Sequence, residues 1–165
     1  MKQMLILIVS LSLLSAAFGQ AEYYEQLNNL YRKSVPFIDA TELKEKIENE
    51  EKVYLLDTRP FEEFKVSHLE GARQVGYESF RIREVKDIPE DATIVVYCSL
   101  GIRSEEVGEK LIEKGFENVF NLYGGMFEWY YQECPVVDMN NKETDKIHAY
   151  NADWARWLRK GEAVY

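Results

Sequence analysis

Cysteine and histidine are scarce in this 165-residue chain, where each occurs twice. Cys98, Cys134, His68 and His148 are scattered without the spacing of a metal-binding cluster, so we expect neither a metal ion nor another cofactor. Basic residues are also in the minority, with 20 Lys and Arg against 29 Asp and Glu and a net charge of −9. This balance argues against nucleic acid or an anionic membrane as a partner, because both require clustered basic surface.

A long apolar run is missing after the first 18 residues. At the N-terminus, Lys2, an apolar segment over residues 4–14 and then SAAFGQ predict a secretory signal peptide over residues 1–19, cleaved before Gln20. An uncleaved anchor is the alternative, but the apolar core is shorter than the ~20 residues of a membrane span. We therefore predict an exported protein, periplasmic or secreted, that has no membrane association after cleavage.

The rest of the chain alternates strand-like and helix-like patterns, which predicts an α/β fold with a mainly parallel sheet in a three-layer sandwich. Residues 94–97, IVVY, carry no charge, as expected for a strand that is buried on both faces. Residues 20–35 are expected to form an N-terminal helical extension. Residues 138–165 are expected to form a C-terminal extension in which Asn151 caps a helix over NADWARWLRKG. This helix would dock against the domain or contact a protein partner.

The segment over residues 92–115 reads as a buried strand, a turn that contains Cys98, and an amphipathic helix that ends at Gly115. Ser104 is the expected N-cap of this helix. Backbone N–H groups at the start of a helix lack carbonyl partners and stabilise an anion, which favours the thiolate form of a cysteine in the turn. Arg103 adds positive charge and Gly101 permits tight curvature. We therefore predict a nucleophile, Cys98, in an anion cradle formed by Ser99, Leu100, Gly101, Ile102, Arg103 and Ser104.

Three segments of the sequence resemble motifs of the rhodanese family. CSLGIRS at Cys98 resembles the active-site loop C-x-x-G-x-R, and LLDTRPFEEFKVSHLEGA at residues 55–72 resembles D-x-R-x-x-x-E-[FY]-x-x-x-H-[IL]-x-G-A. LYGGMFEW at residues 122–129 resembles L-x-G-G-x-x-x-W. The resemblance implies one rhodanese-like domain over residues 36–137 with a five-stranded sheet.

The resemblance also suggests roles for residues outside the loop. Asp57 and Arg59 are expected to support the site, with Arg59 paired to an acid such as Glu62 or Glu63, although contact of Arg59 with substrate is an alternative. His68 is expected to be structural rather than a base for Cys98. If residues 125–132 are helical, Cys134 lies too far from Cys98 for a disulfide and serves as a small buried hydrophobic residue.

Three functions are compatible with these residues. The first is sulfur transfer from a small anionic donor such as thiosulfate to a thiol or cyanide, through a persulfide on Cys98. The second is a cysteine-dependent phosphatase or arsenate reductase, but only four residues separate Cys98 from Arg103, whereas those loops have five. The third is a non-catalytic module that carries a persulfide or binds a partner. Sulfur transfer further requires an accessible sulfur that faces the amide hydrogens and forms no disulfide.

Overall fold

The computed structural model of this protein describes residues 20–165, so the predicted signal peptide lies outside the described residues. The chain divides into two units after Tyr31. In the first unit, residues 20–30 form a helix. Across the described part of the chain, no helix is long and apolar enough to cross a membrane.

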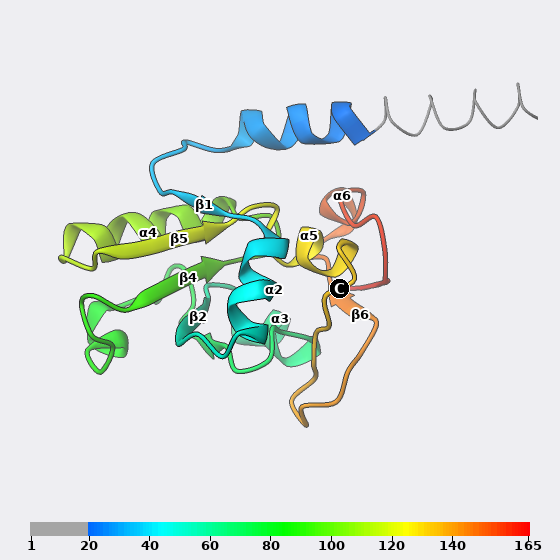
Figure 1. Ribbon diagram of the computed structural model, residues 1–165. Helices are drawn as coiled ribbons and strands as arrows, with labels where there is room; N and C mark the ends of the chain where they lie inside the picture. The colour runs from blue at the N-terminus through cyan, green and yellow to red at the C-terminus, as the bar shows by residue number, and fades with distance from the viewer. Residues whose placement is uncertain (1–19) are drawn as a thin grey trace, which may run out of the picture. The chain divides into compact units, whose positions relative to one another are not determined.

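The second unit is built on a five-stranded sheet whose strands are short (Figure 1). The strands are β1 (Phe37–Ile38), β2 (Val53–Asp57), β3 (Arg73–Gln74), β4 (Thr93–Tyr97) and β5 (Asn118–Leu122). Their order in the sheet is β1-β5-β4-β2-β3, and every neighbouring pair is parallel. The predicted parallel five-stranded sheet is therefore confirmed, and β4 lies at its centre.

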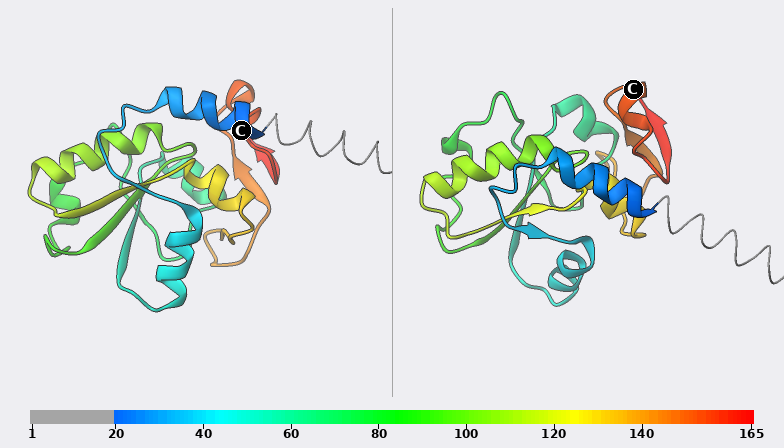
Figure 2. Two further views of the ribbon diagram at one scale, coloured as in Figure 1. Left: turned by 45° about the horizontal axis from the view of Figure 1, so that its top comes forward. Right: turned by 90° about the horizontal axis from the view of Figure 1, so that it is seen from above.

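Helices cover both faces of this sheet. They are α2 (Ala40–Glu48), α3 (Phe61–Val66), α4 (Ile102–Glu113) and α5 (Gly125–Tyr131), with a 3-10 turn over Ile82–Val85. α2 and α4 lie on opposite faces (Figure 2), which gives the three layers predicted from the sequence. Because each connection between parallel strands must return to the starting edge, the carboxyl ends of β2, β4 and β5 meet at one edge.

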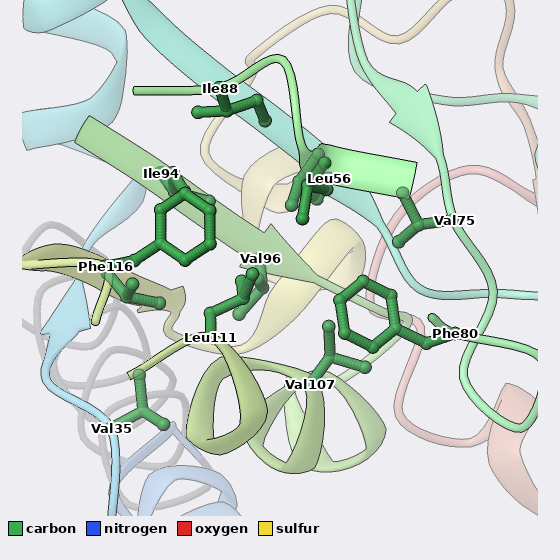
Figure 3. Packing of buried hydrophobic residues seen from close by; sticks show 12 residues of the cluster. Val35, Leu56, Val75, Phe80, Ile88, Ile94, Val96, Val107, Leu111 and Phe116 are labelled. Atoms are coloured by element: carbon green, nitrogen blue, oxygen red, sulfur yellow. The ribbon is translucent and has the colours of Figure 1, made fainter. Parts of the chain in front are cut away.

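The face of the sheet under α4 carries an apolar cluster of buried side chains (Figure 3). Val107 and Leu111 of α4 pack there against Ile94 and Val96 of β4. All four residues of the 94–97 run are fully buried, as the absence of charge predicted. Burial of one such aliphatic side chain stabilises a fold by roughly 1.5–3 kcal/mol, so this cluster fixes α4, and with it the turn that precedes α4, on the central strand.

The C-terminal segment forms a small second sheet beside α5 (Figure 1). β6 (Lys146–His148) and β7 (Glu162–Val164) pair in parallel and flank α6 (Ala152–Ala155). Asn151 caps α6 as expected, because its side chain accepts from the backbone N–H of Trp154. The expected long helix is wrong. After Ala155 the backbone hydrogen bonds join residues that are three apart, as in a 3-10 turn. Gly161, which has a positive φ, then leads the chain into β7.

Ion pairs connect this C-terminal segment to α5. Arg159 pairs with Glu128 of α5, and Lys160 pairs with Glu133 just after α5. Ile147 of β6 is fully buried. The segment is thus packed on the domain through a side chain of β6 and through side chains of the turn between α6 and β7.

Candidate active site

The predicted site lies where the central strand meets α4. Cys98 follows directly after β4, and α4 begins four residues later at Ile102. Gly101 precedes the helix with a φ of +85°, a backbone conformation that favours glycine. The predicted succession of strand, cysteine turn and helix is thus confirmed, with Gly101 making the tight curvature.

Ser104 does not cap α4, contrary to the sequence-based expectation, because the helix starts two residues earlier. Its hydroxyl instead donates to Oδ1 of the buried Asn121 on β5, at 2.8 Å. Nδ2 of Asn121 donates to the carbonyl oxygen of Gly101 at 2.7 Å. Asn121 therefore ties the turn and the start of α4 to the neighbouring strand. This role was not predicted from the sequence, although Asn121 lies between apolar residues in the second half of β5.

The sulfur atom of Cys98 lies within the turn and accepts a hydrogen bond from the backbone N–H of Gly101, at 3.1 Å. Ser99, Leu100 and Ser104 are buried around it. Cys98 and Cys134 are both free thiols, so these two cysteines form no disulfide. The expectation of an accessible sulfur is wrong for this conformation, because Cys98 is only 1% exposed.

The start of α5 packs directly on the back of the cysteine turn. The N–H groups of Met126 and Phe127 donate to the carbonyl oxygens of Cys98 and Ser99, at 2.9 and 3.1 Å. This contact requires glycine at position 125, because a Cβ there would lie 2.4 Å from the Cys98 carbonyl oxygen. Two of the carbonyls in the turn are thereby held away from the sulfur.

Arg103 is held by a bidentate ion pair rather than left free in the cradle. Its two terminal nitrogens donate to the carboxylate of the buried Glu63, at 3.0 and 3.1 Å. Ser99 Oγ lies within hydrogen-bond distance of both groups, at 3.2 Å from Nη2 of Arg103 and 3.2 Å from Oε2 of Glu63. Glu63 of α3 is thus the acid that braces the turn, a role that the sequence analysis did not give it.

The electrostatics of Arg103 follow from its position between two acceptors. Burial disfavours the guanidinium charge, but interactions with the sulfur of Cys98 and with the carboxylate of Glu63 hold the pKa of Arg103 above its ordinary value. The arginine therefore keeps a fixed positive charge beside the sulfur. Most of its hydrogen-bonding capacity toward the turn is taken by Glu63 and Ser99.

Asp57 and Arg59 form a buried ion pair at the carboxyl end of β2. Nε and Nη2 of Arg59 donate to the Asp57 carboxylate at 2.5–3.1 Å, and Nη2 also donates to the carbonyl oxygen of Ser67 at 2.7 Å. Arg59 is 0% exposed, and burial opposes its charge while Asp57 raises its pKa. Arg59 thus forms the structural ion pair expected from the sequence, but the expected partners Glu62 and Glu63 are wrong, because the partner is Asp57. The pair lies under Tyr97, with Arg59 5.8 Å from the centre of that ring.

His68 and Cys134 are both engaged elsewhere in the fold. Nδ1 of His68 lies 3.0 Å from the carbonyl oxygen of Phe64, and its ring stacks on the Phe64 ring at 3.8 Å. The sulfur of Cys134 lies 3.7 Å from the carbonyl oxygen of Gln132, and burial raises the pKa of this thiol. Within residues 20–165, no group of three His, Cys, Asp or Glu side chains is placed to hold a metal ion.

A cleft of about 760 Å³ opens beside the start of α4. Ile102 and Arg103 line it on one side, and residues of α3 and of the 74–79 segment line others. Tyr150 and Trp154 of the C-terminal extension complete the wall. The cleft brings the predicted residues Ile102 and Arg103 to its surface, while Cys98, Ser99 and Leu100 lie buried behind them.

The protein is an α/β domain in which a free cysteine lies in a strand-to-helix turn. This turn follows the central strand of a five-stranded parallel sheet with helices on both faces. The family model of the rhodanese-like domain matches residues 39–132, more than half of the chain. The chain therefore belongs to the rhodanese-like domain family, as its motifs indicated.

The curated relatives differ in how much of their own length this chain matches. A sulfurtransferase of Allochromatium vinosum is 32% identical over 100 residues, which cover 61% of this chain and 92% of the relative. A tRNA uridine(34) hydroxylase of Staphylococcus haemolyticus is 40% identical over 95 residues, which cover 54% of this chain. The chain spans only 29% of the length of that hydroxylase.

Solved structures confirm the fold. The solution structure of a rhodanese-like domain from an Anabaena protein superposes with a TM-score of 0.58 at 27% identity. The superposition covers 63% of this chain and 80% of that domain. The central sheet and its flanking helices are therefore those of rhodanese-like domains.

Proposed function

We propose that this protein is a sulfurtransferase that carries sulfur as a persulfide on Cys98. The observation that carries the proposal is the environment of the free Cys98. Its sulfur accepts a hydrogen bond from the backbone N–H of Gly101, just before the 12-residue helix α4. An N–H donor and the positive end of a helix both stabilise negative charge on sulfur. The similarity to the sulfurtransferase of Allochromatium vinosum, of which the match covers 92%, supports the same chemistry.

The reaction consists of two balanced half-reactions. The Cys98 thiolate attacks the outer sulfur of thiosulfate, a bond forms between the two sulfurs, and sulfite leaves with the electron pair of the broken bond. The outer sulfur of the Cys98 persulfide is then attacked by cyanide or a thiolate. Its bond to Cys98 breaks, and the electron pair stays on Cys98, which is again a thiolate. No residue is assigned as a general base, because the Gly101 N–H and the start of α4 both stabilise negative charge on the sulfur.

The remaining loop residues position this sulfur. Gly101 supplies the N–H and the curvature, Ser99 and Arg103 connect the turn to Glu63, and Ser104 connects it to Asn121. Leu100 is fully buried and Ile102 faces the cleft. Because Cys98 is 1% exposed, the turn or the cleft side chains must open locally before a donor reaches the sulfur.

A persulfide-carrying module without turnover is the second candidate, and the engaged Arg103 favours it. Arg103 is the one positively charged residue among the described residues that line the cleft, and its charge is neutralised by the ion pair with Glu63. A compact dianion such as thiosulfate therefore meets little uncompensated positive charge at the cleft. In this alternative a partner protein delivers and removes the sulfur.

Turnover distinguishes the two candidates. The purified protein is incubated with thiosulfate and cyanide, and thiocyanate is measured over time for the wild type, Cys98→Ser and Cys134→Ser. A sulfurtransferase gives repeated turnover that Cys98→Ser abolishes and Cys134→Ser retains. A carrier gains the mass of one sulfur atom on Cys98 without turnover. Turnover that survives Cys98→Ser would refute both candidates.

Export is part of this proposal. We propose that the signal peptide predicted over residues 1–19 directs the protein to the periplasm or out of the cell, and the net charge of −9 disfavours a nucleic-acid substrate. The C-terminal extension remains the candidate contact for a protein partner.

A further inference from the structure

The cleft beside α4 is larger and more apolar than a small inorganic anion requires. Its volume of about 760 Å³ lies within the range of sites for organic ligands of drug-like size. Its wall is formed largely by apolar and aromatic side chains, namely Pro60, Phe61, Tyr77, Ile102, Tyr150 and Trp154. Burial of an apolar group against such a wall is favourable, whereas cyanide or thiosulfate gains little from it.

The charges at the cleft also disfavour an anionic ligand. Glu78 and Arg103 are the charged residues of the wall. Arg103 is paired with Glu63, and its guanidinium lies 5.3 Å from the centre of the Tyr150 ring. The positive charge is thus shared between a carboxylate and an aromatic face, while Glu78 adds negative charge.

The aromatic wall is held in place by the C-terminal extension. Tyr150 has a φ of +66°, which is uncommon for a residue with a side chain, and its N–H donates to Nδ1 of His148 at 3.0 Å. The neighbouring Ala149 donates its N–H to Val164 of β7 at 2.9 Å. The rings of Tyr150 and Trp154 meet edge to face at 6.0 Å. The backbone of the extension therefore directs Tyr150 to Arg103, at the mouth of the cysteine turn.

We propose that Tyr150 and Trp154 select the sulfur acceptor, and that the acceptor is a low-molecular-weight thiol that carries an aromatic group and no charged group besides its reacting sulfur. This inference rests on the proposed sulfur transfer. The aromatic group packs between Tyr150, Trp154 and Phe61, and the thiolate of the acceptor approaches the persulfide past Ile102 and Arg103. Its sulfur bonds to the outer sulfur of the persulfide, the bond to Cys98 breaks, and Cys98 is released as a thiolate.

The test compares acceptors in the same assay, with thiosulfate as donor. For the wild type, kcat/KM for benzyl mercaptan should exceed that for glutathione, a charged and hydrophilic thiol, by about tenfold or more, as expected for an apolar group in a matching pocket. Tyr150→Ala and Trp154→Ala should lower the ratio of kcat/KM for benzyl mercaptan to kcat/KM for cyanide about tenfold, mainly through the KM for benzyl mercaptan. Tyr165→Ala is the matched control, because Tyr165 is a 66% exposed aromatic of the same extension that does not line the cleft.

A second measurement tests binding in the cleft independently of sulfur transfer. Titration with benzyl methyl sulfide, a thioether that has no thiol to accept sulfur, is followed by NMR shifts of the Tyr150 and Trp154 rings. The shifts of both rings should saturate in the wild type and in Cys98→Ser, and the shift of the Trp154 ring should be lost in Tyr150→Ala. Equal kcat/KM losses for cyanide and benzyl mercaptan, a preference for glutathione, or an absence of ring shifts would each overturn the inference. Saturating ring shifts without any turnover would instead refute the proposed catalysis and leave the aromatic binding wall supported.

Discussion

Substitution of Gly125 by alanine tests the packing of α5 on the cysteine turn. The added Cβ would lie 2.4 Å from the carbonyl oxygen of Cys98 and 2.8 Å from the backbone nitrogen of Gly101, both shorter than any normal contact. The φ of +56° at this position adds the strain of a left-handed backbone, roughly 1–2 kcal/mol. Overpacking adds about 1–3 kcal/mol, so we expect Gly125→Ala to lower the free energy of unfolding by about 2–5 kcal/mol.

Gly71→Ala is the matched control. Gly71 has a similar φ of +75°, but nothing lies within 4 Å of a Cβ built there, so only the backbone strain of about 1–2 kcal/mol applies. Urea unfolding measures both free energies, and thiocyanate formation measures activity. Because the clash falls on the cysteine turn, Gly125→Ala should also lower kcat about 100-fold, the effect of a misplacement near 1 Å. If both variants lose equal stability and keep full activity, the close approach of α5 does not position the site.

Two further predictions concern charged pairs. Glu63→Gln removes the carboxylate that pairs with the partly buried Arg103, and should lower the free energy of unfolding by about 2–4 kcal/mol. The control Glu62→Gln changes an exposed neighbour and should cost less than about 0.5 kcal/mol, so equal costs in urea unfolding would contradict the bracing role. Hydrogen bonds from Arg73 lower the pKa of Asp87 from 3.8 to about 2. Because the folded-state pKa is lowered, this contribution to stability is present above pH 3.8 and is lost as the pH falls to about 2. Asp87→Asn should therefore flatten the acid side of the stability profile measured by thermal unfolding, and an unchanged slope there would show that the pair does not contribute.

Local patterns in the sequence predicted most of the fold, because strand and helix preferences depend on neighbouring residues. The uncharged run over residues 94–97 is the buried central strand, and Asn151 caps a helix as its residue type indicated. The helix after Asn151 is much shorter than expected, because pairing between β6 and β7 outweighs the local helical preference of the segment that follows.

The partners of the site residues were harder to predict. The sequence identified Cys98, Gly101 and Arg103 as parts of one turn, because they lie within six residues of one another. It did not identify Glu63 as the partner of Arg103 or Asn121 as the partner of Ser104, since these residues come from other elements. The order of the strands in the sheet decides which of these side chains meet.

The sequence alone determined that a cysteine stands between a buried strand and a helix, because a strand, a turn and a helix are set by residues next to one another. Only the tertiary structure decided that Cys98 is buried, that Glu63 holds Arg103, and that Tyr150 lines the cleft. Those contacts join segments far apart in the chain, and they exist only once the parallel sheet brings the ends of its strands to one edge.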